Sequence, residues 1–330
     1  MPRVSNDPQD GPVDRIAELL DVLDLREVGT AQADVRPVLT AAPPQPDPAE
    51  GMADVFAEEI TVFVGQSQKM PHGRVFGGQV LAQGVIAAGR TVTPRPGEPV
   101  RLLHSLHGYF MRPGDDTMPI HFSVERMRDG RSFSTRRVHA IQHGKPILSM
   151  IASFQEPAGG LDHQDPMPDV AGPEGLRSLS DVFGGIDDPR ARHLAEGRAI
   201  EQRHVEGNLY LAAGPERVAA QHVWLRATGP LPDDPLIHQA VLAYASDYSL
   251  LEPVIRRHGV TWSDPRLRPA SLDHSMWFHR PGRADEWVLY ASQSPSAQGG
   301  RGLGLGRMYA ADGTLVATVA QEGMLRIREG

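Results

Sequence analysis

The spacing of apolar and polar residues along the chain changes between two periods, and the period predicts where helices and strands lie. Four consecutive segments show the alternation of half-buried strands, and each ends in a turn signal: 100–114, 118–130, 131–144 and 145–156. Before them lie a short strand-like run at 60–67 and a long apolar, small-residue helix predicted over 74–94. A similar succession of strands, one helix and more strands returns after residue 198.

Short motifs in the two halves of the chain can be aligned with each other. The run YFMRPGDD at 109–116 matches WFHRPGRAD at 277–285, and SFQE at 153–156 matches VAQE at 319–322. The chain is therefore predicted to be a tandem repeat of one helix-plus-antiparallel-sheet unit, an α+β fold. One helix followed by a meander of long strands fits a hotdog unit, in which the sheet wraps the helix. Two such units would form a pseudo-dimer, a double hotdog.

Composition along the chain suggests four segments. Residues 1–12 are polar and rich in proline and glycine, which predicts a disordered tail. The first repeat is expected over 13–156, with an amphipathic helix at 13–29 and an insertion at about 30–59. Residues 157–198 are rich in glycine, proline and aspartate and are interpreted as a linker. The second repeat is expected over 199–330.

One carboxylate stands out within the second repeat. Asp234 and Pro235 are a typical helix start, and the helix predicted from there places Asp247 on an otherwise apolar face. A buried, unpaired carboxylate costs several kcal/mol or more, so such a residue must be paired, protonated or used in chemistry. Aligning the helices of the two repeats puts Ala87 opposite Asp247.

Composition excludes several classes of function. A formal net charge of −8 argues against general attraction to nucleic acid or anionic membranes. The absence of cysteine excludes disulfides, cysteine nucleophiles and thiolate metal sites. No membrane span and no signal peptide are expected from the sequence, so the cytoplasm is the default prediction. The fourteen histidines show no metal-ligand spacing, and neither a Walker loop nor a serine-nucleophile elbow is present. No metal and no cofactor are predicted.

Seven motifs in order carry a resemblance to a known family. They are RVFGGQVLAQ, HSLHGYFMRPGDD, ERMRDGRSFSTRRV, SFQEP, AYASDYSLL, LDHSMWFHRP and VATVAQEGMLR. Together they resemble the type II acyl-CoA thioesterases, double-hotdog enzymes that hydrolyse acyl-CoA thioesters. The resemblance covers roughly 13–29 and 60–329, nearly the whole chain.

The resemblance implies a water-activating trio of Asp, Thr and Gln in the second repeat. By position the trio falls on Asp247, Ser271 and Gln321, and a serine at 271 departs from the family's threonine while keeping the hydroxyl. The repeat alignment puts Leu103 opposite Ser271 and Gln155 opposite Gln321. Since the first repeat lacks the first two polar groups, one catalytic site per chain is expected.

Other candidates concern substrate binding. Gly77, Gly78 and Gln79 precede or begin the first long helix, where bare N–H groups would polarise a thioester carbonyl or bind an anion, or simply allow close packing. Glycines alternate in RGLGLGR at 301–307, which predicts a strand that a backbone or ligand approaches closely. Arg301 and Arg307 are candidates for CoA phosphates, although surface solvation is the more ordinary interpretation.

The predicted function is hydrolysis of acyl-CoA to fatty acid and CoA, with Asp247 as general base. The acyl chain is expected between sheet and helix, against Ala82, Gly84 and Ala87. The alternative is a non-catalytic acyl-CoA binding or sensor protein of the same fold. The expected partner is acyl-CoA, with no nucleic acid. An open hotdog sheet leaves an edge strand, which favours a homo-oligomer of even order.

Overall fold

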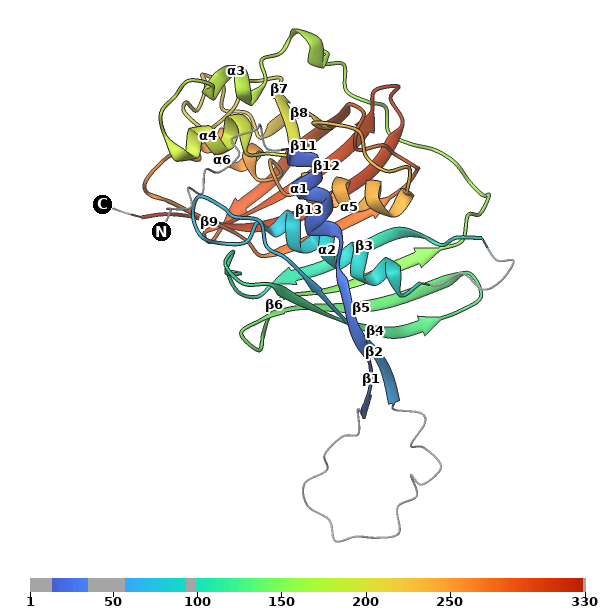
Figure 1. Ribbon diagram of the computed structural model, residues 1–330. Helices are drawn as coiled ribbons and strands as arrows, with labels where there is room; N and C mark the ends of the chain where they lie inside the picture. Colours follow the sequence, from blue (N-terminus) through green and yellow to red (C-terminus); the bar gives the residue numbers. More distant parts are fainter. Residues whose placement is uncertain (1–13, 35–56, 93–98, 329–330) are drawn as a thin grey trace, which may run out of the picture.

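A computed structural model of the chain describes residues 14–34, 57–92 and 99–328. These residues form one antiparallel sheet that curves around paired helices (Figure 1). The strands of the first half are β1 (Arg26–Asp34), β2 (Ala57–Gly65), β3 (Leu102–Phe110), β4 (Ile120–Asp129), β5 (Phe133–Gln142) and β6 (Lys145–Gln155). Those of the second half are β7 (Ile200–His204), β8 (Ala220–Ala227), β9 (Leu267–Ser271), β10 (Asp273–Phe278), β11 (Val288–Gln298), β12 (Arg301–Ala310) and β13 (Leu315–Ile327).

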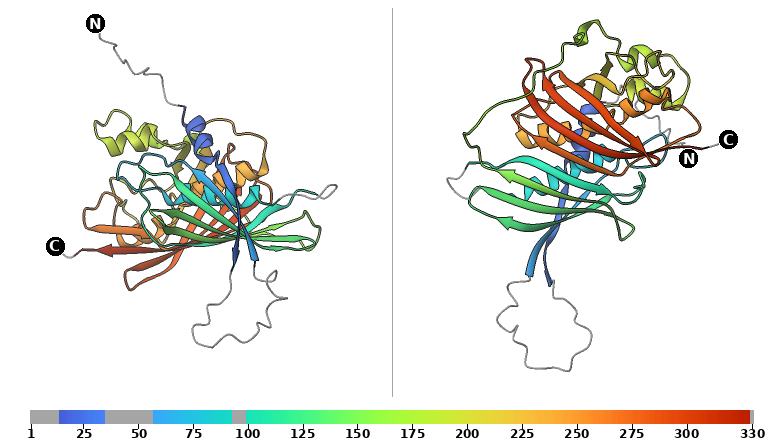
Figure 2. Two further views of the ribbon diagram at one scale, coloured as in Figure 1. Left: turned by 60° about the horizontal axis from the view of Figure 1, so that its bottom comes forward. Right: turned by 180° about the vertical axis from the view of Figure 1, so that it is seen from behind.

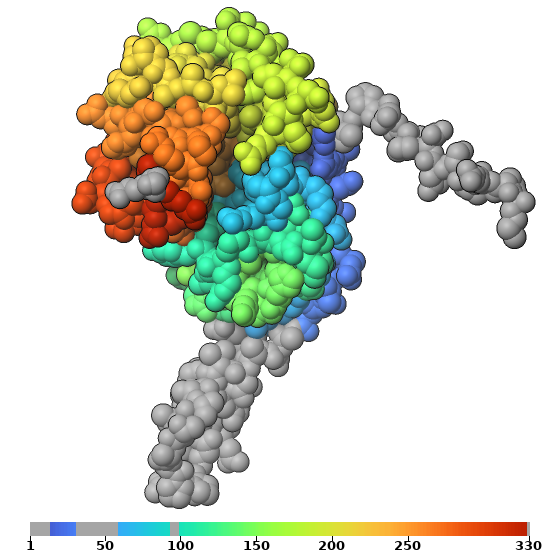
Figure 3. Space-filling view, turned by 90° about the vertical axis from the view of Figure 1, so that its left-hand side faces the viewer, coloured from blue at the N-terminus to red at the C-terminus, as the bar shows by residue number. Residues whose placement is uncertain are grey.

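The strand order reads the same from both ends of the sheet. It runs β1-β2-β4-β5-β6-β3 in the first half and continues β10-β13-β12-β11-β8-β7 in the second, with β9 paired to β13. The halves join at β3 and β10, where His107 lies opposite Ser275. Each half thus contributes the same six-strand sequence in mirror order, as a tandem pseudo-dimer requires. The space-filling view shows the halves stacked, the first in cyan to green and the second in yellow to red (Figure 3).

The helices of the described residues are α1 (Arg15–Leu23), α2 (Gly77–Arg90), α3 (Leu179–Phe183), α4 (Pro189–Glu196), α5 (Pro235–Ser246) and α6 (Glu252–His258), with a 3₁₀ turn at Pro173–Gly175. The central pair, α2 and α5, packs side by side inside the curved sheet, and the view from behind shows the strands that cover it (Figure 2). The pair is antiparallel: a Cβ on Gly78 would lie 2.3 Å from the carbonyl oxygen of Tyr244, and one on Gly89 would lie 2.5 Å from the Leu236 side chain. Glycine at these two positions therefore allows the helices to touch.

The glycine-rich run 301–307 is the strand predicted from sequence, part of β12. A Cβ on Gly304 would lie 2.2 Å from the carbonyl oxygen of Leu250, and one on Gly306 would lie 2.4 Å from the Tyr290 ring. The expected close approach of backbone is thus found at Gly304, which makes room for the chain between α5 and α6, while Gly306 makes room for the Tyr290 ring of β11.

Two segment boundaries differ from the sequence-based expectation. The predicted helix at 13–29 ends at Leu23, and Arg26–Asp34 pairs with Ala57–Gly65 as a hairpin. Within the predicted insertion, residues 30–34 and 57–59 are therefore strand, while 35–56 lie outside the described residues, as does the predicted tail at 1–12. Val28 and Thr30 are residue types that favour a strand. The apolar stripe of the preceding helix α1 hid the change from the helical period to the strand period. The predicted linker 157–198 contains α3 and α4.

Candidate active site

The end of helix α5 positions Asp247. The helix begins as predicted, with the Asp234 carboxylate accepting from the Leu236 N–H and Pro235 in the first turn. It ends at Ser246, so Asp247 is the C-cap residue and does not lie in mid-helix as the sequence suggested. The next helix, α6, begins at Glu252 with Pro253 in its first turn, where a missing N–H is tolerated.

The three predicted catalytic residues meet at this helix end. Ser271, the last residue of β9, donates its hydroxyl proton to Oδ1 of Asp247 at 3.2 Å. Gln321, from the middle of β13, donates from Nε2 to the Ser271 hydroxyl at 2.8 Å. Three segments far apart in sequence thus bring a carboxylate, a hydroxyl and an amide into one hydrogen-bonded group.

The first half of the chain completes this group. A Cβ on Gly77 would lie 2.5 Å from Oδ2 of Asp247, so only glycine leaves the carboxylate its present place. The Gly78 N–H at the start of α2 is hydrogen-bonded to the same carboxylate. The site is therefore composite, with its acid from the second repeat and its glycine wall from the first.

The surroundings of Asp247 tune its acidity. The side chain is partly buried, and desolvation raises its pKa from 3.8 to about 6. Hydrogen bonds from Gln321, Ser271 and the Gly78 N–H act in the opposite direction and lower the pKa. At neutral pH the group is thus an ionised carboxylate that is more basic than an ordinary aspartate.

The N–H groups proposed to polarise a carbonyl already have partners. That of Gly78 faces Asp247, and that of Gln79 donates to the carbonyl oxygen of Phe76 at 3.1 Å. The Gln79 side chain is fully buried and holds the preceding loop, accepting from the Gln68 N–H at 3.0 Å. Gln79 is therefore a support for the loop before α2.

The two candidate arginines for CoA phosphates lie elsewhere. Arg301 is paired with Glu322 at 2.8 Å and Arg307 with Asp165 at 2.9 Å. Alternate residues of β12 are buried, and both arginines belong to the other set. They point away from the face that carries Gln321, so the structure does not bring them to Asp247.

One polar residue of the site was missed in the sequence. His274 on β10 is fully buried, with Nδ1 against Oε1 of Gln321 and Nε2 2.9 Å from the Ser246 hydroxyl. In the sequence it was one of fourteen histidines without metal-ligand spacing and was not singled out as a site residue. The signal was present, because the offset that aligns Tyr109 with Trp277 also aligns Leu106 with His274.

The repeat alignment of Gln155 with Gln321 is wrong. With His107 aligned to Ser275 at the junction, the ladders place Ile151 opposite His107 and Ala320 opposite Ser275, so Ala152 corresponds to Gln321. Gln155 follows the buried Phe154 and lies on the other face of the sheet. The motif-based alignment was out of register because β-bulges lie at different places in the strands of the two halves. The first repeat therefore has no glutamine equivalent to Gln321.

A pocket of about 410 Å³ opens beside the site. Tyr244 and Tyr248, from the end of α5, form part of its wall, together with the loop at 68–71 and residues of α1 and α4. Phe76, next to Gly77, stacks on Tyr248 with ring centroids 4.7 Å apart. An aromatic layer thus connects this pocket with the wall of the Asp247 site.

The described part of the chain contains no cluster of three or more His, Asp or Glu side chains suited to a metal ion. Among its helices, none is long and apolar enough to cross a membrane.

Comparisons with known proteins match both halves. A family model described as acyl-CoA thioesterase matches residues 191–324, and one described as acyl-CoA thioesterase N-terminal domain matches 66–155. Acyl-CoA thioesterase 2 of Haemophilus influenzae is 39% identical over 272 residues, 81% of this chain and 93% of that protein. Human acyl-coenzyme A thioesterase 8 is 40% identical over 281 residues, 81% of this chain and 85% of its own length.

Solved structures agree with these matches. The acyl-CoA thioesterase II TesB2 of Mycobacterium marinum is 37% identical with a TM-score of 0.68, covering 95% of this chain and 98% of that one. The tesB protein of Mycobacterium avium subspecies paratuberculosis is 30% identical with a TM-score of 0.69, over 94% and 98%. A hot dog fold protein of Alicyclobacillus acidocaldarius, 20% identical, has a TM-score of 0.65 over 81% of this chain and 94% of its own. The predicted double-hotdog fold is confirmed.

Proposed function

The chain belongs to the acyl-CoA thioesterase family, and on that premise we propose the reaction that its Asp247 site performs. The protein is an acyl-CoA thioesterase, as its motifs predicted. It hydrolyses acyl-CoA to a free fatty acid and CoA by direct attack of a water molecule on the thioester carbonyl. The catalytic residues are Asp247, Ser271 and Gln321.

Asp247 is the general base. Its carboxylate takes one proton from the water as the water oxygen bonds to the carbonyl carbon, which gives a tetrahedral oxyanion. The oxyanion collapses, the C–S bond breaks, and the proton held by Asp247 passes to the departing sulfur. One water is consumed, and the carboxylate is regenerated. A thioester is electrophilic enough for this route without a covalent enzyme intermediate.

Two properties of Asp247 support this role. Its pKa is about 6, and hydrogen bonds from Gln321, Ser271 and the Gly78 N–H hold its carboxylate in place. A base is most effective when its pKa lies just below the working pH, because it is then both ionised and strongly basic. Ser271 donates to Asp247 and accepts from Gln321, which leaves one hydroxyl lone pair to orient a water. The Gln321 amide also hydrogen-bonds Asp247 and so helps to hold the carboxylate.

The start of α2 supplies the electrostatic contribution. Its N-terminal end carries a partial positive charge that favours the oxyanion. The Gly78 N–H, bound to Asp247 in the free site, turns to the oxyanion once the carboxylate has accepted its proton and attracts the N–H less. Gly77 keeps this approach open.

The 410 Å³ pocket beside Tyr244 and Tyr248 is lined mostly by charged and polar side chains, such as Arg15, Lys69 and Glu196, and does not suit an acyl chain. The earlier expectation of a position against Ala82, Gly84 and Ala87 conflicts with the packing: both alanines are fully buried, and a Cβ on Gly84 would lie 2.9 Å from the Met150 side chain. That space is filled by the protein's own core.

The experiment that tests the proposal is thiol release from acyl-CoA, followed with Ellman's reagent, for the wild type and Asp247→Asn. The substitution keeps the shape and removes the base, so kcat should fall by about 100-fold or more. Asp312→Asn is the matched control, since that carboxylate also accepts a backbone N–H but lies in the exposed β12–β13 turn. Near-wild-type turnover by Asp247→Asn overturns the mechanism. Absence of turnover in the wild type favours the acyl-CoA binding protein instead.

A further inference from the structure

We propose that His274 is a positioning residue of the thioesterase site, whose Nδ1–H holds the Gln321 amide so that its N–H points to Ser271 and Asp247. The inference rests on the proposed function and extends it, because His274 itself touches neither Asp247 nor Ser271 through any hydrogen bond among the described residues. It acts through Gln321.

The direction of each hydrogen bond follows from Asp247 outward. An ionised carboxylate only accepts, so the single hydroxyl proton of Ser271 goes to Asp247. The Ser271 oxygen must then accept from its other neighbour, which makes the nearer atom of Gln321 the amide nitrogen. The Gln321 carbonyl oxygen therefore faces His274, and Nδ1 of His274 must carry a proton.

The state of the histidine fits this polarity. Burial lowers the pKa of His274 to about 4, so the ring is neutral and carries one proton, here on Nδ1. Nε2 is then an acceptor and receives the Ser246 hydroxyl proton over 2.9 Å. The same hydroxyl lies 2.8 Å from the carbonyl oxygen of Ala243, a competing acceptor. Tyr290 donates to the Ser246 carbonyl oxygen and so fixes the last turn of α5.

The first half of the molecule shows that the fold does not require this histidine. The ladders match Leu106 to His274 and Ala152 to Gln321, and both first-half residues are fully buried in the core. An apolar pair fills the same place between sheet and helix. The polar pair of the second half therefore has a purpose other than packing, and among the described residues it is hydrogen-bonded to Ser271, Asp247 and Ser246.

Three substitutions separate positioning from packing. Asn at 274 places an amide N–H near the position of Nδ1 and can still donate to Gln321. Gln reaches the position of Nε2 and leaves Gln321 without a donor. Leu reproduces the first repeat. We expect His274→Asn to retain kcat within about 10-fold, while His274→Gln and His274→Leu lose about 10–100-fold with KM little changed. His279→Asn is the control, since that ring bonds the Thr318 hydroxyl away from the site.

The pH profile gives a readout that packing alone would not move. Since the Gln321 hydrogen bond lowers the pKa of Asp247, releasing the amide should raise that pKa. The acid limb of kcat/KM should therefore move to higher pH in His274→Leu and His274→Gln but stay in place in His274→Asn. Of the groups around Asp247, burial raises the pKa of Tyr248 and Tyr290, and His274 is neutral above about pH 4, so none of them titrates near pH 6.

Two results overturn the inference. One is equal kcat for the Asn, Gln and Leu variants; the other is an unchanged acid limb in His274→Leu that still folds, as judged by its thermal unfolding. Both remain distinct from failure of the proposed function, which Asp247→Asn decides by itself. If Asp247→Asn is inactive and the His274 variants are alike, Asp247 stands as the base and the role of His274 is structural.

Discussion

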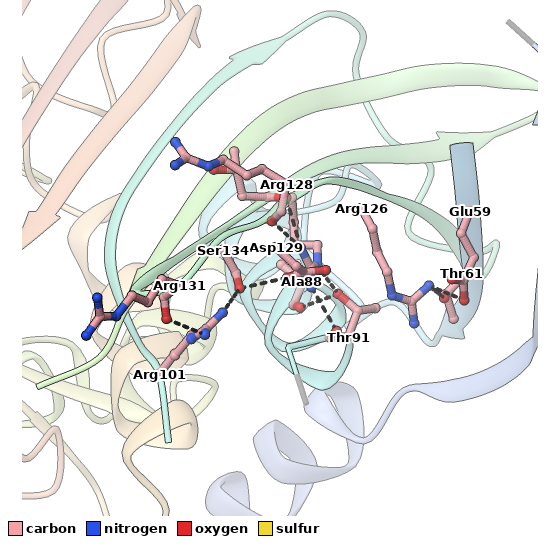
Figure 4. A network of polar contacts seen from close by, with 12 residues as sticks. Glu59, Thr61, Ala88, Thr91, Arg101, Arg126, Arg128, Asp129, Arg131 and Ser134 are labelled. Atoms are coloured by element: carbon pink, nitrogen blue, oxygen red, sulfur yellow. Dashed lines mark hydrogen bonds and ion pairs between the residues drawn. The ribbon is translucent and has the colours of Figure 1, made fainter. Parts of the chain in front are cut away.

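The C-terminal ends of the two central helices, α2 and α5, are in contact with side chains of opposite charge. At the end of α2, Thr91 is the C-cap, and the buried guanidinium of Arg136 donates to its hydroxyl at 2.8 Å and to its carbonyl oxygen at 3.0 Å. Asp129 balances Arg136 at 2.8 Å, and Figure 4 shows this network around Thr91, Asp129 and Ser134. A cation at a helix C-terminus meets the partial negative charge of the last carbonyls and stabilises the helix.

Helix α5 ends on the opposite charge. Its C-cap is Asp247, a carboxylate that meets the same partial negative charge and has no cation within ion-pairing distance among the described residues. The first half thus shows how this fold stabilises a helix end, and the second half departs from it. A departure of this kind, in a duplicated unit, marks the place where selection acted on chemistry at the expense of stability.

The largest effect is expected from replacing the glycine near either end of α2 by alanine. Gly77→Ala would drive a methyl group to 2.5 Å from Oδ2 of Asp247, so the carboxylate must move and kcat should fall by about 100-fold. Gly89→Ala meets the flexible end of Leu236 at the same distance and should lower stability by about 1–3 kcal/mol while preserving kcat. Steady-state kinetics and thermal unfolding of both variants check this. Similar kinetic losses in the two would remove the special status of the Asp247 end.

The next test concerns the hydroxyl that distinguishes Ser271 from Leu103. Ser271→Ala removes a hydrogen bond to a charged group and should lower kcat about 10–100-fold. Ser271→Thr keeps the hydroxyl and should preserve or improve activity. Leu103→Ala, its counterpart in the first half, should affect stability only. A Ser271→Ala enzyme as fast as the parent would exclude Ser271 from the water-binding group.

A smaller effect is expected in the dependence on pH. Since the pKa of Asp247 is about 6 in the folded chain, activity should fall by half near pH 6 and about tenfold per pH unit below it. The same shift affects stability: the raised pKa favours the protonated, folded form, so this contribution is present below about pH 4 and is lost as pH rises through 6. Asp247→Asn should therefore unfold at a higher temperature than the wild type at about pH 8 and at nearly the same temperature at about pH 4. A higher unfolding temperature for the wild type than for Asp247→Asn at the higher of the two pH values contradicts this.

The smallest effect is expected in the number of substrate molecules bound per chain. If only the second-half site binds substrate productively, calorimetric titration with a non-hydrolysable acyl-CoA analogue should give one molecule per chain. In Leu103→Ser the count should remain one, because Leu106 and Ala152 still fill the rest of the first-half site. A count of two equal sites per chain would show that both halves bind substrate, and the difference between the halves would then concern catalysis only.

Much of this architecture was predictable because it repeats local patterns. Alternation of apolar residues indicated the long strands, and Asp234 with Pro235 marked the start of α5 correctly. The comparison with Leu103 identified Ser271 as unusual, and the apolar face of α5 did so for Asp247, although the helix ends match Asp247 to Thr91 and not to Ala87. These inferences needed only local sequence and the assumption of a duplicated unit.

What was missed depends on registers and contacts across the chain. The strand at Arg26–Asp34 pairs with residues beyond a long intervening segment, so its hairpin left no local turn signal. The slip that matched Gln155 to Gln321 came from bulges, which letters do not reveal. The contact of His274 with Gln321 joins β10 to β13 and shows only in the structure, although the repeat offset already matched His274 to Leu106. The position of the two arginines on the outer face of β12 likewise depends on which residues of the strand turn inward.

The junction of β3 and β10 has a consequence for how the chain folds. Within each half several strand pairs join neighbours in sequence, such as β5 with β6 and β12 with β13, whereas His107 and Ser275 meet across more than half the chain, a contact with a large loop-closure entropy. We therefore expect the halves to gain structure first and the junction to close last. Gly77 and Asp247 come from different halves, so catalytic activity should return in the slowest refolding phase, later than the burial of Trp224 and Tyr290 within the second half.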